Sequence, residues 1–205
     1  MKFIDLSHKI IDCLPAYPGD EETRLVNTRK LKENSYTNHR LHIDMHSGTH
    51  IDSPMHLIDS KEYICDYPLE SFIGEGCIID VRNEPVIKLK KEFKDIITNG
   101  CILLLYTGLC RKFGTEEYFN CHPVVDMEFA EFMVERKIKI LGMDTPSPDK
   151  PPFSVHRLLL KNKIFILENL TNLEKLLDAE KFEVIALPLN IKADSSILRV
   201  VARMI

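Results

Sequence analysis

Long hydrophobic runs are missing from the sequence: no segment contains the roughly 18 uninterrupted apolar residues typical of a membrane-spanning helix. The first residues, Met1–His8, also lack the extended apolar stretch of a secretory leader. Both absences argue against a helical membrane protein and against export. We therefore expect a cytoplasmic protein.

An excess of basic residues is absent as well. The 205 residues include 27 Lys and Arg against 31 Asp and Glu, which gives a formal net charge of -4. The lysine-rich stretch 88–95 also contains Glu92 and Asp95 and is typical of a solvated helix face. Since the chain has no basic footprint, we do not expect it to bind nucleic acid.

None of the six cysteines belongs to a Cys-x-x-Cys pair. Free thiols are expected, because the chain lacks a leader to an oxidising compartment and is too large to depend on disulfides. A structural zinc site made of cysteine pairs is disfavoured for the same reason. Cys121 precedes His122, but neighbours in an extended chain point apart, so no nucleophilic pair is predicted.

Internal repeats, low-complexity tracts and linkers are also absent, and 44% of the residues are hydrophobic. One domain spanning residues 1–205 is therefore predicted. Apolar runs that predict strands are mixed with segments of helical periodicity, which favours an α/β fold. The strands are expected at 3–6, 77–81, 101–106, 138–144, 164–168, 184–189 and 198–202. Helical spacing marks 89–97, 126–133 and 170–177, and Ser154 is expected to cap a short helix that carries His156.

Four candidate metal ligands or proton carriers lie within the eleven residues His46–His56. His46, His50, Asp52 and His56 share one sequence parity, while apolar side chains of the segment share the other, as in a strand. In a helix, Asp52 would point roughly 200° away from His50, so the carboxylate would be lost from the cluster. The strand interpretation is therefore favoured.

A straight strand would hold the Cα atoms of His46 and His50 about 13 Å apart, too far for one ion with Zn–N bonds near 2.1 Å. Gly48 lies between them and permits a bend. We therefore predict a turn at residues 47–49 that lets His46, His50 and Asp52 converge. Two imidazoles and a carboxylate suit zinc, manganese or iron.

Other candidate residues have two possible roles each. The proline-rich loop 14–20 places Tyr17 either on the wall of a pocket or at an ordinary exposed position. His42 and Asp44 share the polar parity of the cluster and are either hydrogen-bond partners of the ligands or solvent-facing strand residues. Glu168 ends an apolar run, where a metal would explain the carboxylate; an exposed strand end is the alternative.

The segment His46–His56, which reads HSGTHIDSPMH, resembles the HxGTHxDxPxH signature of the cyclase or metal-dependent hydrolase family without departure. That family includes bacterial kynurenine formamidases and isatin hydrolases. Two more elements are similar: the turn at Gly142–Asp149, and His156 followed twelve positions later by Glu168 in Ile-Leu-Glu-Asn. The resemblance covers nearly the whole chain. It departs at Tyr17 before Pro-Gly-Asp, where bacterial kynurenine formamidases often have Trp.

The resemblance implies a swivelling β/β/α-type fold, with a mixed sheet partly closed into a barrel and flanked by helices. It implies a divalent metal cofactor, two zinc ions with manganese as the alternative, and a homodimer or homotetramer. His56 would be the general acid and base, and Tyr17 would contact the substrate. The implied metal ligands are His46, His50, Asp52, His156 and Glu168.

With these residues, the resemblance implies hydrolysis of a C–N bond in a small aromatic amide, with N-formylkynurenine as the leading substrate. The metal would activate water towards an amide carbonyl, and His56 would carry protons to the leaving amine. Another cyclic amide or lactone hydrolase, or a cyclase, would use the same site. A non-catalytic protein that binds a metal or ligand is the alternative from a different class, and it has no need of the additional His56.

Overall fold

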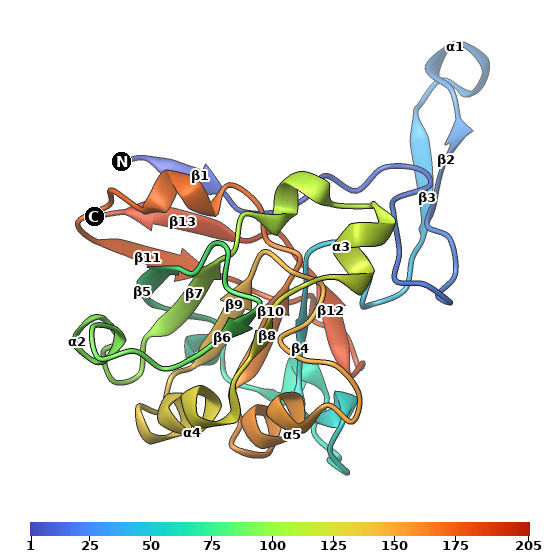
Figure 1. Cartoon of the computed structure of the whole chain (residues 1–205). Coiled ribbons are helices and arrows are strands. Elements are labelled where there is room, and N and C mark those ends of the chain that lie inside the picture. The colour runs from blue at the N-terminus through green and yellow to red at the C-terminus, as the bar shows by residue number, and fades with distance from the viewer.

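The computed structural model describes residues 1–205 and contains thirteen strands and five α-helices (Figure 1). The strands are β1 Phe3–Asp5, β2 Arg24–Arg29, β3 Asn38–His42, β4 His50–Asp52, β5 Ile73–Asp80, β6 Val86–Ile87, β7 Ile102–Tyr106, β8 Val124–Val125, β9 Ile140–Met143, β10 Phe165–Glu168, β11 Phe182–Ile185, β12 Ser195–Ile197 and β13 Val201–Met204. The α-helices are α1 Leu31–Asn34, α2 Phe93–Ile96, α3 Glu116–Asn120, α4 Met127–Glu135 and α5 Ser154–Lys161. Short 3-10 helices occur at η1 Pro54–His56, η2 Ile64–Asp66, η3 Leu69–Phe72, η4 Leu109–Lys112 and η5 Leu173–Leu176.

Nine strands form one mixed sheet in the order β1-β13-β11-β5-β7-β9-β10-β4-β12. The four central strands β5, β7, β9 and β10 run parallel, and the pairs on both sides of them are antiparallel. The sheet curls strongly into a half-barrel, with α2, α4 and α5 on one side (Figure 1). The predicted α/β fold with a partly closed mixed sheet is thus confirmed.

Apolar residues are buried on both faces of the sheet, as expected for central parallel strands. In β7, Leu103 and Leu105 belong to a core of 22 buried residues that includes side chains of α2, α4 and α5. Ile102, Leu104 and Tyr106 belong to a second core of 20 buried residues on the inside of the curl. The uninterrupted apolar run at 101–106 therefore reflects burial on two sides. None of the helices combines the length and apolarity needed to span a membrane.

Sequence periodicity located elements more accurately than it located their ends. The strands expected at 3–6, 77–81, 101–106, 138–144 and 164–168 correspond to β1, β5, β7, β9 and β10. The helix expected at 89–97 is only the single turn α2, and the segment 170–177 contains the 3-10 helix η5. The strands expected at 184–189 and 198–202 overlap β11 and β13 but have different ends. Pairing of β13 with β1 and β11 determines these ends, and local periodicity does not reveal that pairing.

The N-terminal cap of α5 differs from the prediction. Ser154 is the first helical residue and does not cap the helix. The carboxylate of Asp149 instead accepts hydrogen bonds from the backbone N–H groups of Val155 and His156, at 2.7 and 3.3 Å. The turn before the helix brings Asp149 back over the helix end, so a cap assigned from the adjacent residue was wrong.

A hairpin projects from the body of the molecule and consists of β2, α1 and β3 (Figure 1). At its base, His42 Nε2 lies 3.1 Å from Glu21 Oε2, and the Asp44 carboxylate accepts a hydrogen bond from the Glu21 backbone. His42 and Asp44 therefore contact Glu21 at the base of the hairpin. Neither of these contacts involves a candidate metal ligand. The polar sequence of residues 21–37 predicted no strand there.

Candidate metal centre and active site

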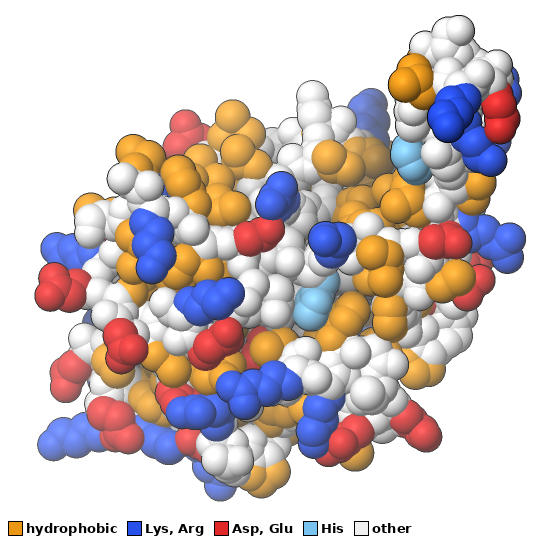
Figure 2. Space-filling view, turned by 90° about the horizontal axis from the view of Figure 1, so that it is seen from above, with side chains coloured by type: hydrophobic (Ala, Val, Ile, Leu, Met, Phe, Trp, Pro, Cys, Tyr) orange, Lys and Arg blue, Asp and Glu red, His pale blue; other side chains and the backbone are white.

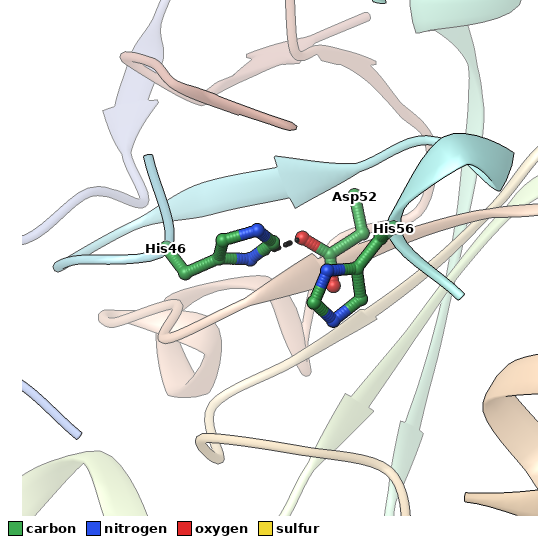
Figure 3. Close-up of side chains that lie close together, drawn as sticks. All are labelled: His46, Asp52 and His56. Carbon is green, nitrogen blue, oxygen red and sulfur yellow. Dashed lines mark ion pairs between the residues drawn. The ribbon is translucent and has the colours of Figure 1, made fainter. Parts of the chain in front are cut away.

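The histidine-rich segment bends at Gly48, where φ is +64°. A Cβ atom at this position would also lie 2.9 Å from Leu14 Cδ2, so packing and backbone both favour glycine. His46 lies in the turn before the bend, and β4 starts at His50. The structure therefore has the predicted turn, which brings the side chains of His46 and Asp52 together (Figure 3).

Sheet register completes the cluster. Strand β4 lies between β10 and β12, and Glu168 on β10 is directly opposite His50. Glu168 Oε2 lies 3.3 Å from His50 Nε2, while Glu168 Oε1 lies 3.3 Å from His156 Nε2 on α5. His46 Nδ1 is 2.9 Å from Asp52 Oδ1. The five side chains predicted as metal ligands thus meet at one place.

Two of the imidazoles are oriented by hydrogen bonds on the nitrogen that faces away from Glu168. His50 Nδ1 donates to the Gly48 carbonyl at 2.9 Å, and His156 Nδ1 donates to Asp149 Oδ1 at 2.5 Å. Histidines that ligate metals commonly donate their other ring N–H to a carbonyl or carboxylate in this way. Nε2 of each ring is consequently the nitrogen available to a metal.

Three buried atoms of the cluster have no hydrogen-bond partner: His50 Nε2, Asp52 Oδ1 and Glu168 Oε1. Each lies within 3.5 Å of another charged or polar group, but these pairs lack hydrogen-bond geometry. Buried polar atoms are normally paired, so atoms that converge without pairing fit a cation. Two ligand groups converge within 4.8 Å and share Asp52, namely His50–Asp52–Glu168 and His46–Asp52–His56.

The electrostatics of the cluster favour positive charge. Burial by itself would lower the pKa of His46, but the carboxylates of Asp52 and Asp194 raise it to about 11. For His156, Asp149 and Glu168 likewise overcome burial and raise the pKa to about 10. Burial would raise the pKa of Asp52, yet the surrounding imidazoles hold it below its usual range. A divalent cation would supply this positive charge while the imidazoles remain neutral.

Asp194 is a member of the site that sequence patterns did not identify. Its Oδ2 lies 2.9 Å from His46 Nε2 and 3.4 Å from His56 Nδ1, and these two contacts lower its pKa. Its carbonyl accepts hydrogen bonds from the Ser53 backbone and hydroxyl groups. Asp194 lies in a polar loop without periodicity, and it reaches the site because Ser195 of β12 is opposite Asp52.

A cavity of about 300 Å³ opens over the cluster. Its polar end includes all six predicted metal-binding and catalytic residues, and Tyr17 lies on its wall. Tyr17 is 45% exposed and packs edge-to-face on Phe119, with 5.9 Å between ring centroids. The other aromatic side chains on the wall, which the sequence did not identify, are Phe113, Phe119 and Phe153. Aromatic side chains therefore form part of the cavity wall next to the charged cluster.

Cys121 and His122 do not form a catalytic pair. Cys121 is exposed, whereas His122 is buried with Nδ1 3.0 Å from the Phe119 carbonyl and Nε2 3.4 Å from the Asp149 carbonyl. Burial lowers the pKa of His122. His122 therefore links the aromatic wall to the turn that orients His156.

Comparison with known proteins identifies the family and the fold of the chain. Residues 4–150 match the family model described as "Putative cyclase". Kynurenine formamidase of Bacillus cereus is 33% identical over 208 residues, which cover 98% of this chain and 97% of that protein. Isatin hydrolase A from Labrenzia aggregata bound to benzyl benzoate has a TM-score of 0.86 at 24% identity, covering 98% of this chain and 93% of that one. An isatin hydrolase bound to the product analogue thioisatinate has a TM-score of 0.87 at 21% identity, with coverage of 98% and 91%. The chain therefore belongs to the cyclase family, together with the kynurenine formamidase to which it is 33% identical.

Proposed function

We propose that the protein is an amidohydrolase that cleaves the C–N bond of a small aromatic amide, with N-formylkynurenine hydrolysed to kynurenine and formate as the leading reaction. The observation that carries this proposal is the cavity with converging histidines and carboxylates at one end and an aromatic wall at the other. The similarity to kynurenine formamidase over nearly the whole chain supports it. We place the activity in one cytoplasmic domain, residues 1–205, that works as a homo-oligomer.

The proposed cofactor is a pair of divalent ions, zinc with manganese as the alternative. Asp52 belongs to both converging groups, and Glu168 presents one oxygen to His50 and the other to His156, so these two carboxylates would help to hold the ions. When bound, such ions supply Lewis acidity for an amide carbonyl and lower the pKa of water. His46 completes the proposed ligand set.

His56 is the proposed proton carrier. It follows β4 on η1 and lines the cavity. Its Nδ1 faces Asp194, which leaves Nε2 to accept a proton from the attacking water and return it to the leaving nitrogen. Tyr17 and Phe119 would hold the aromatic ring of the substrate next to this nitrogen.

Hydrolysis of a cyclic amide such as isatin is the second candidate. The similarity to an isatin hydrolase bound to thioisatinate favours it. Tyr17, which is smaller than Trp, keeps an aromatic wall but changes its size, and this departure bears on the substrate more than on the chemistry. Lactone hydrolysis or cyclisation at the same site, and metal binding without turnover, are the remaining alternatives.

A substrate panel on protein with defined metal content separates these functions. We expect kcat/KM for N-formylkynurenine to exceed that for isatin and simple lactones by at least about tenfold, the factor that 1.4 kcal/mol of better transition-state binding gives. A preference for isatin would favour the cyclic-amide hydrolase. Stoichiometric metal with no turnover of any panel member would favour the non-catalytic binder.

Replacing Asp194 with asparagine is expected to lower kcat/KM or metal affinity by about 10- to 100-fold, as is typical when the hydrogen-bond partner of a metal-binding histidine is changed. The physical reason is that Asp194 orients His46 and His56 through one oxygen. Steady-state kinetics and calorimetric zinc titration would measure the two effects. Asp178→Asn, at an exposed position, is the matched control. A change below about threefold in both quantities would contradict a positioning role.

A further inference from the structure

Asp20 lies on the wall of the cavity and belongs to neither of the two groups of converging ligands. The two acidic residues that follow it have partners within the chain. Glu21 Oε2 lies 3.1 Å from His42 Nε2, and Glu22 Oε2 lies 4.0 Å from an Arg24 nitrogen. The carboxylate of Asp20 forms no ion pair of this kind, so it remains available to a group of a bound molecule.

A turn at residues 17–20 holds this carboxylate close to an aromatic ring. The Asp20 backbone N–H donates to the Tyr17 carbonyl at 3.0 Å, and Gly19 has a φ of +107°. Proline and glycine at the two central positions, as in Tyr-Pro-Gly-Asp, are typical of a type II turn. Tyr17 packs on Phe119 of α3, which fixes one end of the turn against the body. The turn therefore presents a ring and a carboxylate near each other on the cavity wall.

The charge of the cavity wall is negative away from the proposed metal ligands. No lysine or arginine lines the cavity, and Asp20 is the only charged side chain on the lining besides the predicted ligands and His56. Hydrophobic side chains lie next to the base of the projecting hairpin, which follows the turn in the sequence (Figure 2). A carboxylate attracts an ammonium group, and the face of an aromatic ring does so as well. An anionic group would meet no cationic side chain on this wall.

We propose that Asp20 binds an ammonium group on the side chain of the aromatic substrate, so that the cavity selects cationic side chains over neutral and anionic ones. The identity of the bond that is cleaved rests on the proposed amide hydrolysis, to which this inference adds the charge of the group that lies away from the metal. The substrate ring lies against Tyr17 and Phe119, its amide faces the histidine cluster, and its ammonium group meets Asp20. N-formylkynurenine carries an ammonium group of this kind.

Three ortho-formamidophenyl ketones, which differ only in an aminoethyl, a hydroxyethyl or a carboxyethyl group, test this selectivity on the metal-loaded wild type. We expect kcat/KM for the aminoethyl ketone to exceed that for the hydroxyethyl ketone by about five- to tenfold, the range for an exposed ion pair reinforced by an aromatic face. The difference is expected in KM, because the contact does not involve the reacting atoms. Raising the NaCl concentration from about 0.1 M to about 1 M should reduce the preference, since salt screens exposed charges.

Replacing Asp20 with asparagine is expected to bring the aminoethyl-to-hydroxyethyl ratio of kcat/KM close to one. Asp20→Lys is expected to raise the carboxyethyl ketone relative to the aminoethyl ketone by at least about tenfold compared with the wild type, because the sign of the charge is reversed. Glu22→Gln is the matched control, since Glu22 lies two residues away and outside the cavity lining, and it is expected to retain the wild-type ratio. Circular dichroism of every variant checks that the fold is retained.

Calorimetric binding of the corresponding ortho-aminophenyl ketones, the products of hydrolysis, gives a measurement that needs no turnover. If no amide is hydrolysed but the aminoethyl product binds the wild type more tightly than Asp20→Asn, the ammonium site stands and the proposed hydrolysis fails. Equal affinity of the wild type for the aminoethyl and hydroxyethyl products, or a preference that persists in folded Asp20→Asn, would overturn the ammonium site. Turnover of the amides alongside either of those results would leave the proposed hydrolysis intact.

Discussion

Replacing Glu168 with glutamine is expected to lower kcat/KM for the amide by about 10³-fold or more. Both Glu168 oxygens lie 3.3 Å from an imidazole nitrogen, so the change removes the charge shared by His50 and His156. Metal ions contribute several kcal/mol to such reactions, and about 4 kcal/mol corresponds to about 10³ in rate. Glutamine retains the size of the side chain, so the loss reports on charge rather than on packing.

Metal analysis of the same variant by mass spectrometry should show at least one ion fewer per chain than in the wild type. Glu131→Gln is the matched control, because Glu131 is exposed on α4 and outside the cavity. Wild-type turnover together with full metal content in Glu168→Gln would exclude Glu168 as a ligand.

The part of the site within residues 46–56 could be predicted because its constraints are local. Side-chain parity groups His46, His50 and Asp52, and the reach of a metal–nitrogen bond then requires a bend between the two histidines. Only Gly48 in that interval freely adopts a positive φ, and the structure has φ of +64° there. The bend between His46 and His50 depends only on residues that are neighbours in the sequence, so the sequence is sufficient to predict it.

Residues that arrive through sheet pairing could not be located in this way. Asp194 contacts His46 across 148 residues, and the register of β12 against β4 determines this contact. Its loop has no periodic pattern and no chemical signature. Phe113, Phe119 and Phe153 on the cavity wall likewise come from separate segments whose packing has no local signal. The hairpin of β2 and β3 was not predicted for another reason: its strands are exposed on both faces, so apolar alternation is absent.

His156 was predicted as a ligand only by family resemblance, whereas Glu168 was also indicated by its place at the end of an apolar run. Their proximity in the structure has a physical origin in two independent contacts. Register puts Glu168 opposite His50, and Asp149 both caps α5 and accepts a hydrogen bond from the His156 ring. A single carboxylate thus fixes the helix and the orientation of the imidazole it carries.

Replacing His56 with alanine is expected to lower kcat by about 10²- to 10⁴-fold, the usual contribution of general acid–base catalysis, while both metal ions remain bound. This result follows if His56 carries protons. If His56 is instead a third ligand beside His46 and Asp52, with which it converges within 4.8 Å, metal content should fall as well. Measuring kcat and metal content on one preparation separates these roles.

His39→Ala is the matched control for His56→Ala, because His39 is exposed on β3 and outside the cavity. Turnover of His56→Ala within about threefold of the wild type would exclude His56 from proton transfer, since even weak general catalysis contributes about 10². The position of His56 on η1, after the end of β4, favours the role of proton carrier over that of metal ligand. Pro54 opens η1 and turns His56 away from the strand, where Asp194 holds Nδ1 and leaves Nε2 for the substrate.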